Sequence, residues 1–174
     1  HGLFLLLLLG HLAQELLAAL NLDLALHGEL VLAVGLLDRV LERGVARGLG
    51  LEPRVAFLSF SNFGYAVSER AVKMAKATEV LDRRGVDFEY EGEMTVDVAL
   101  NMDSAARYPF SRLTGPANVL VVPARHSASI SVKLMQEMAG ATVIGPILTG
   151  VPQAIQICST TSTVNDILNM AAIA

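Results

Sequence analysis

The chain has few of the features that would cross-link it covalently or anchor it in a membrane. Its single cysteine, Cys158, excludes a disulfide framework within the 174 residues and fits a reducing compartment, so we expect a cytoplasmic protein. The apolar run Leu3 to Leu9 is far shorter than the roughly 20 residues that a membrane-spanning helix needs. A buried strand explains this run better, and we expect no membrane partner.

Excess positive charge and metal-binding motifs are also missing. The 13 Lys and Arg residues are outnumbered by 17 Asp and Glu, and the net charge of -4 argues against a nucleic-acid partner. One cysteine and scattered histidines do not form a metal site. The sequence contains no GxGxxG or Walker loop, so it predicts neither a dinucleotide site nor a nucleoside triphosphate site in this chain.

Apolar residues, in contrast, are abundant. They make up 53% of the chain while charged residues make up 17%, a more apolar balance than in a typical soluble domain. Two explanations stay open: a large interface hidden in an oligomer, or a fragment without its covering elements. The chain begins at His1 rather than at methionine and ends at Ala174 within an apolar stretch, so we expect a segment of a larger protein.

The sequence divides into a uniform apolar segment, residues 1–48, and a segment with clear structural signals, residues 49–174. The first segment could belong to the same domain, but its pattern gives no reliable period. Candidate strands there are Leu3 to Leu9 and Glu29 to Val34, and candidate helices are Gln14 to Leu20 and Asp38 to Ala46. We assign no function to it.

Strands and helices alternate in the second segment. Strands are predicted at Arg54 to Ser61, Phe88 to Tyr90 and Asn118 to Val122, with further strands or extended segments at Ile144 to Leu148 and Ala154 to Ile157. Helices are predicted from the Ser68 cap to Arg84, and at Thr95 to Leu100, Ser127 to Met138 and Asn165 to Ile173. This alternation predicts an α/β fold with a mainly parallel sheet sandwiched by helices.

Ligands of open parallel sheets bind at the carboxyl ends of the strands, where three loops qualify: Ser59 to Gly64, Pro123 to Ser127, and Cys158 to Asp166. The third loop is rich in hydroxyl groups and leads into a helix N-terminus, which is a plausible anion cradle. It carries no positive charge, so it suits binding better than phosphoryl chemistry. The simpler interpretation, favoured for Thr163, is a helix cap completed by Asp166; for Ser159 both interpretations stay open.

Other polar residues have simpler explanations. A lone loop histidine such as His126 is more often a surface residue than a catalytic base. Glu91, Glu93 and Asp97 could form a carboxylate cluster, but a solvated acidic loop is the favoured interpretation. Arg107 and Arg112 flank Pro109 and could bind phosphate or a neighbouring subunit.

Several segments, in order, resemble the phosphotransacetylase domain, and more specifically the version fused behind bacterial NADP-dependent malic enzymes. They are LSFSNFG (Leu58 to Gly64), EGEMTVDVALN (Glu91 to Asn101), PFSRLTGPANVLVVP (Pro109 to Pro123), ATVIGPILTGVPQAIQICS (Ala141 to Ser159) and VNDILNMAAIA (Val164 to Ala174). The resemblance covers roughly residues 48–174, implies a phosphotransacetylase-like part of a two-subdomain fold, and leaves the first segment poorly matched.

The resemblance also implies site residues. The family transfers acetyl groups between coenzyme A and phosphate, and its final loop places the serine near the reacting thiol on Ser159 and the proposed base on Asp166. The arginine that holds phosphate falls on Thr160, and a second family arginine falls on Glu137. Replacing Arg by Thr removes charge-assisted bonds worth about 1.5–3 kcal/mol each, and Glu adds repulsion.

We therefore expect retained binding of acetyl-CoA, lost acetyl transfer and vestigial catalytic positions. The predicted ligand residues are Ser159, Thr160 and Glu137, together with Ser61 and Asn62 of the first loop. Fused malic enzymes imply a homodimer or higher homo-oligomer that senses acetyl-CoA, with NADP and Mg or Mn bound only by the part outside this chain. Two alternatives stay open: an active phosphate acetyltransferase that uses Arg107 or Arg112, and a purely structural dimerisation module.

Overall fold

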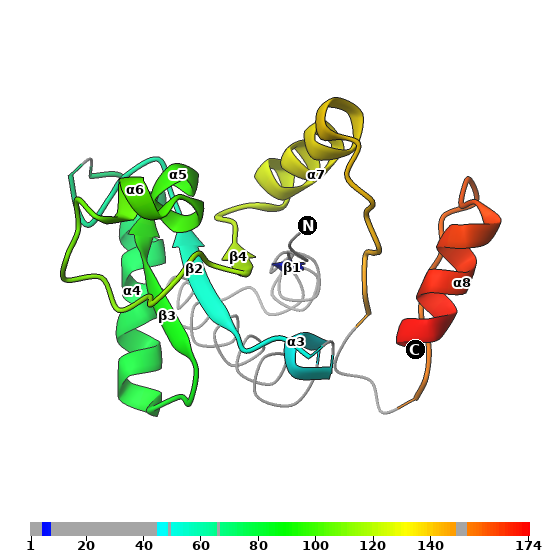
Figure 1. The fold of residues 1–174 in the computed structure, drawn as a ribbon, viewed down its shortest axis with the longest axis horizontal. Coiled ribbons are helices and arrows are strands. Elements are labelled where there is room, and N and C mark those ends of the chain that lie inside the picture. Colours follow the sequence, from blue (N-terminus) through cyan, green and yellow to red (C-terminus); the bar gives the residue numbers. More distant parts are fainter. Residues whose placement is uncertain (1–4, 8–44, 49, 66, 149–152) are drawn as a thin grey trace, which may run out of the picture. The chain divides into compact units, whose positions relative to one another are not determined.

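The computed structural model describes residues 5–7, 45–48, 50–65, 67–148 and 153–174 (Figure 1). The chain divides into two compact units, His1–Ala128 and Ser129–Ala174, which are described separately below. The predicted elements at Gln14 to Leu20 and Glu29 to Val34 lie outside the described residues. Of the helix predicted at Asp38 to Ala46, only the end is described, where the short helix α3 spans Val45–Gly48.

The described residues of the first unit form a four-stranded sheet in the order β1-β4-β2-β3, and every pair of neighbouring strands is parallel (Figure 1). The strands are β1 (Leu5–Leu7), β2 (Arg54–Leu58), β3 (Glu89–Met94) and β4 (Val119–Val121). The predicted parallel α/β sheet is confirmed. Strand β3 is longer than the predicted Phe88 to Tyr90, because it continues through the two glutamates that we had assigned to a loop.

Strands β2 and β4 are buried on both faces, as their continuous apolar sequences require. Val55 and Phe57 of β2 face one core cluster with Leu81 of helix α4, while Ala56 and Leu58 face another with Val98 of helix α5. Because successive side chains of a strand point to opposite faces, one short strand supplies both cores. This two-sided burial fixes the sheet and leaves its carboxyl edge for the polar loops.

Helix α4 (Glu69–Arg84) begins and ends where its sequence signals predict. The hydroxyl of Ser68 accepts a hydrogen bond from the Ala71 amide, which satisfies one of the free N–H groups of the first turn. Gly85 closes the helix in the left-handed conformation with φ of 63°, which glycine adopts at little cost. The apolar face of α4 packs on β2 and β3.

Two short helices follow β3. Helix α5 (Val96–Leu100) was predicted from Thr95, whose side chain makes no capping hydrogen bond to the helix backbone. Helix α6 (Met102–Ala105) follows it directly and is capped by the side chain of Asn101, which accepts from the Asp103 amide. The chain then passes through residues 106–118 to β4.

The second unit contains most of helix α7 (Arg125–Ala139) and all of helix α8 (Val164–Ile173). Both helices match the predictions within two residues. Within the part of the chain that the structure describes, the segments Ile144 to Leu148 and Ala154 to Ile157 form no strand. The side-chain amide of Gln156 bonds the backbone of Leu148 at 2.8 and 3.2 Å, which replaces part of the ladder that a strand partner would supply.

Candidate functional site

The loop Ser59 to Gly64 leaves the carboxyl end of β2 and is attached to the end of β3. Its backbone amides at Ser59 and Phe63 donate to the carbonyl oxygens of Met94 at 2.8 Å and Glu93 at 2.9 Å. The loop therefore continues the pairing of the two strands beyond the sheet. Its position is fixed by backbone hydrogen bonds and not by side-chain packing alone.

A buried carboxylate supports the middle of this loop. Glu93 is 3% exposed, and its Oε1 accepts hydrogen bonds from the Ser61 hydroxyl at 2.9 Å and from the Gly64 amide at 2.7 Å. The strand register shifts at this point, since Phe57 pairs with Gly92 and Leu58 with Met94, so Glu93 is the extra residue of a bulge. Bulges re-aim side chains in this way. The predicted solvated acidic loop is therefore wrong for Glu93.

The predicted ligand residues Ser61 and Asn62 lie side by side in this loop but differ in what they offer. Ser61 is 1% exposed and donates to Glu93, so it holds the loop in place. Asn62 is partly exposed, and its Oδ1 accepts from the amide and the hydroxyl of Thr95 at 2.8 and 3.1 Å. Within the described residues its side-chain NH₂ has no partner. Asn62 is the better candidate for contact with a ligand, and both assignments stay predictions.

A second buried carboxylate, Glu91, lies two residues earlier on β3 and holds Arg112. The Arg112 guanidinium donates to both carboxylate oxygens at 3.2 and 3.3 Å, and its backbone amide donates to Oε2 at 2.9 Å. Its remaining nitrogen bonds Asp82, and its Cζ lies 4.6 Å from the ring centre of Tyr90. Glu91 is 6% exposed, so the prediction of a solvated loop is wrong here as well.

These contacts also determine whether Arg107 and Arg112, the two candidate phosphate-binding arginines, are available for a ligand. Desolvation disfavours the charged form of Arg112, but the bonds to Glu91 and Asp82 outweigh it and raise its pKa above the usual value. The guanidinium of Arg112 is thus already paired, and it holds the segment around residue 112 against β3. Arg107 is exposed, donates to the Ser104 carbonyl at 3.3 Å and lies 3.8 Å from Asp97. Asp97 alone of the three acidic residues is exposed as predicted.

Acid should weaken the network around Asp82. The hydrogen bond from Tyr90, aided by Arg112, lowers the pKa of Asp82, so the stability it contributes is present above the unfolded pKa of about 3.9 and is lost as pH falls below it. We expect urea midpoints to hold between pH 7 and about pH 5 and then to fall. Asp82→Asn should lower the midpoint at pH 7 and flatten that fall. Asp103→Asn is the control, because the Asp103 carboxylate has no partner among the described residues; an equal response of the two variants would contradict the assignment.

In the second unit, the loop Cys158 to Asp166 closes on itself. The Ser159 hydroxyl lies 2.9 Å from that of Thr161 and accepts from the Thr161 amide at 3.2 Å. Thr163 caps α8, and its amide and hydroxyl each donate a hydrogen bond of 2.8 Å to Oδ2 of Asp166. The predicted capping box is confirmed. Ser159 remains exposed at the surface of the loop.

Asp166 has the electrostatics of a cap. The bonds from the backbone and then the side chain of Thr163 lower its pKa. A general base working near neutral pH gains from the opposite shift. The geometry therefore favours a structural role for Asp166, and the expectation that this catalytic position is vestigial stays a prediction.

The two positions where the family resemblance expects arginine are both exposed in this unit. Thr160 lies in the loop, and Glu137 lies in the last turn of α7. Residues 129–174 contain a single cationic side chain, Lys133. The second unit therefore has too little positive charge of its own to hold a phosphate dianion bidentately.

His126 lies exposed in the first turn of α7 and has no hydrogen-bond partner in the described part of the chain, which agrees with a surface residue. Among the described residues, no group of three His, Cys, Asp or Glu is placed to hold a metal ion. No helix within those residues is both long and apolar enough to cross a bilayer.

Sequence reasoning missed the roles of Glu91, Glu93 and Arg112. The signal that could have found the glutamates is their spacing, because Glu89, Glu91 and Glu93 alternate as strand residues do. The negative charges of these glutamates favour the interpretation of a solvent-exposed loop over that of a strand. Their partners lie 21 to 32 residues away along the chain, and no local pattern identifies them.

Comparison with known proteins agrees with the resemblance drawn from the motifs. A family model described as phosphate acetyl/butaryl transferase matches residues 40–174. An NADP-dependent malic enzyme of Rhizobium meliloti is 54% identical over 131 residues, which are 75% of this chain and 17% of the relative. A phosphate acetyltransferase of Clostridium acetobutylicum is 39% identical over 124 residues, which are 71% of this chain and 37% of the relative.

Solved structures show the same relationship. A phosphotransacetylase from Streptococcus pyogenes superimposes with a TM-score of 0.72 at 30% identity, covering 83% of this chain and 43% of that one. The EutD phosphotransacetylase from Staphylococcus aureus gives 0.67 at 29% identity, covering 74% and 40%. The chain thus spans about a sixth of the length of the malic enzyme and about two-fifths of the phosphotransacetylases.

Proposed function

Because the chain belongs to the phosphate acetyl/butaryl transferase family, we propose that it is the acetyl-CoA-binding regulatory part of an NADP-dependent malic enzyme and does not transfer acetyl groups. In this role it builds a homo-oligomer and transmits acetyl-CoA binding to the malic enzyme part. NADP and the divalent metal, Mg or Mn, belong to that other part, and the protein works in the cytoplasm.

The observation that carries the proposal is the charge of the second unit. The phosphate substrate of acetyl transfer is a dianion, and stabilising its transition state needs fixed cations. The loop around Ser159 has Thr160 and Glu137 at the two arginine positions, and Lys133 is the only cation in residues 129–174. The thioester group of acetyl-CoA is neutral, so binding this group does not require fixed cations.

Acetyl-CoA binding draws support from the first unit. The loop Ser59 to Gly64 is held by backbone bonds to β3 and by Glu93, so it is ordered before any ligand arrives. Asn62 presents a side-chain NH₂ that can donate to a ligand carbonyl. Such a loop can bind the amide-rich arm of a coenzyme without positive charge.

The test measures binding and turnover on the same preparation of the complete protein. We expect titration calorimetry with acetyl-CoA to give saturable heat, and acetyl-phosphate formation from acetyl-CoA and phosphate to stay at the uncatalysed level. Asn62→Ala should weaken acetyl-CoA binding about tenfold or less, the size of one hydrogen bond. Its matched control is Asn169→Ala, a partly exposed asparagine of α8 that lies outside both candidate ligand loops. Robust acetyl-phosphate turnover would overturn the proposal, and absent heat would favour a purely structural dimerisation module.

The alternative is an active phosphate acetyltransferase that uses Arg107 or Arg112. The internal bonds of Arg112 to Glu91 and Asp82 speak against it, since releasing Arg112 leaves Glu91 buried without a countercharge. Arg107 is the remaining candidate, held by a long hydrogen bond to the Ser104 carbonyl and a weak pair with Asp97. If turnover is found, Arg107→Ala should abolish it under this alternative.

A further inference from the structure

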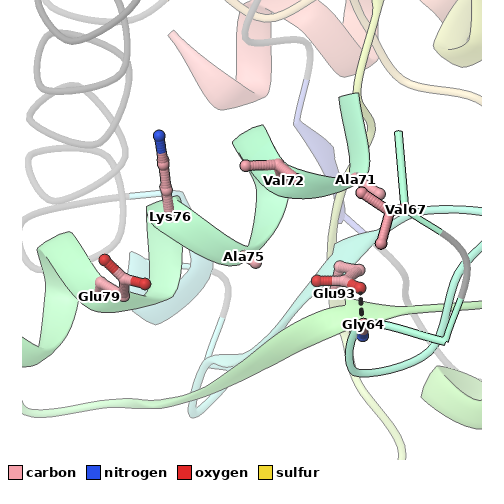
Figure 2. A pocket seen from close by; sticks show the side chains of 8 residues that line it. All are labelled: Gly64, Val67, Ala71, Val72, Ala75, Lys76, Glu79 and Glu93. Carbon is pink, nitrogen blue, oxygen red and sulfur yellow. Dashed lines mark hydrogen bonds between the residues drawn. The ribbon is translucent and has the colours of Figure 1, made fainter. Parts of the chain in front are cut away.

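A small cavity of about 150 Å³ lies in the first unit along the flank of α4, beside the end of the loop that follows β2 (Figure 2). Its apolar walls come from Val67 and from Ala71, Val72 and Ala75 of α4. Glu93 and Gly64 close one end of the cavity. Of these residues only Gly64 belongs to the loop proposed to bind acetyl-CoA, so the cavity adjoins that site without including Ser61 or Asn62.

The carboxylate of Glu93, which lines this cavity, accepts hydrogen bonds at only one of its two oxygens from the described residues. Glu93 is 3% exposed, and the hydrogen bonds from Ser61 and Gly64 both go to Oε1. No residue in the described parts of the chain donates to Oε2. In Figure 2 one oxygen of Glu93 is directed at Gly64 while the other is turned away from it, toward the side of α4. A buried acceptor without a donor is costly, so an occupant that donates a hydrogen bond is favoured.

The charges around the cavity favour a cation. Glu93 and Glu79 contribute negative charge, and Lys76 is the one cationic side chain among the described residues of the lining. Figure 2 shows Lys76 extending away from Glu93, so it does not neutralise the carboxylate. The four apolar side chains of the wall favour a short hydrocarbon chain on the same molecule.

We propose that this cavity binds a small primary ammonium ion with a short apolar chain, the ammonium donating to Oε2 of Glu93 and the chain packing on Val67 and Ala75. Because Oε1 of the same carboxylate holds Gly64, an occupant is sensed by the loop Ser59 to Gly64. The cavity is thereby a second ligand site connected to the ligand loop through one side chain.

The test is a titration of the full chain with n-propylammonium chloride at constant ionic strength, followed by the backbone amide resonances of Gly64 and Ser61. We expect a saturable shift at both amides. n-Propanol, which has a donor but no charge, should bind more weakly, and propionate should not bind. A response that is linear in concentration, or that is the same for all three compounds, would mean that the cavity holds water alone and would overturn the proposal.

Two variants separate the site from general effects. Glu93→Gln keeps an acceptor for Ser61 and Gly64 but turns an NH₂ toward the cavity, so propylammonium should bind at least about tenfold more weakly. Ala75→Leu fills the cavity from a partly exposed helix position and should abolish the shift. Its control is Ala139→Leu, an exposed alanine of α7. Unchanged affinity in Glu93→Gln, with the fold checked by circular dichroism, contradicts the assignment whatever acetyl-CoA does.

Discussion

Replacing Gly92 with alanine should lower the free energy of unfolding by about 3 kcal/mol or more, one of the two largest losses expected of a single substitution in this chain. A Cβ at this position would meet the Cβ and the carbonyl oxygen of Phe57 at 2.7 Å, a distance that real Cβ atoms do not tolerate. The neighbour is strand backbone, so it cannot turn aside. Gly92 also has φ of 148°, which side chains rarely adopt.

Urea unfolding of Gly92→Ala beside Gly85→Ala separates these two causes. Gly85 also has positive φ, of 63°, but nothing lies within 4 Å of a Cβ there. Gly85→Ala should therefore cost only the backbone strain, about 1 kcal/mol. Equal losses in the two variants would show that the close approach of β2 and β3 at the bulge does not matter.

Replacing Arg112 with methionine should destabilise the first unit by about 2–4 kcal/mol. Methionine fills a similar volume but leaves the carboxylate of Glu91, which is 6% exposed, without its countercharge. The partial exposure of Arg112 keeps the expected loss at or below the value for a fully buried pair. Arg112→Lys should recover part of the loss, since it restores the charge without the bidentate geometry.

A double-mutant cycle provides the decisive measurement for this pair. Glu91→Gln with Arg112→Met removes both charges, and the double variant should be more stable than Arg112→Met alone. Urea midpoints of the two single variants and the double variant give the coupling energy. A double variant no more stable than Arg112→Met would mean that the methionine loses packing and hydrogen bonds, and that charge compensation has no part in it.

The fold was largely readable from the sequence because its signals are local. The continuous apolar run after Arg54, the Ser68 cap and the Gly85 stop each follow from neighbouring residues. Helix α4 formed as predicted, and β2 begins at the predicted Arg54 but ends at Leu58, three residues before the predicted Ser61. The Thr163 and Asp166 capping box was readable for the same reason, since its members are three residues apart. Whether the segments after α7 form strands was harder to predict, because a strand needs a pairing partner that the local sequence does not identify.

The loop Ser59 to Gly64 illustrates the opposite case. Its place at the end of a strand, and thus its candidacy as a ligand loop, was predicted from the order of elements. Two features of the loop were not predictable: Ser61 donates to Glu93, and the side-chain NH₂ of Asn62 has no partner among the described residues. The partners that Ser61 and the Asn62 Oδ1 do have lie about 30 residues further along the chain.

The sequence by itself determined the alternation of strands and helices, the family, and the absence of arginine at positions 137 and 160. Composition and local patterning suffice for these, since they depend on residue types and short spacings. Only the tertiary structure decided whether the charged side chains of β3 are buried or exposed. It buried Glu91 against Arg112 and Glu93 against Ser61 and Gly64, because a bulge and the packing of distant loops, not hydropathy, determine which side chains leave water.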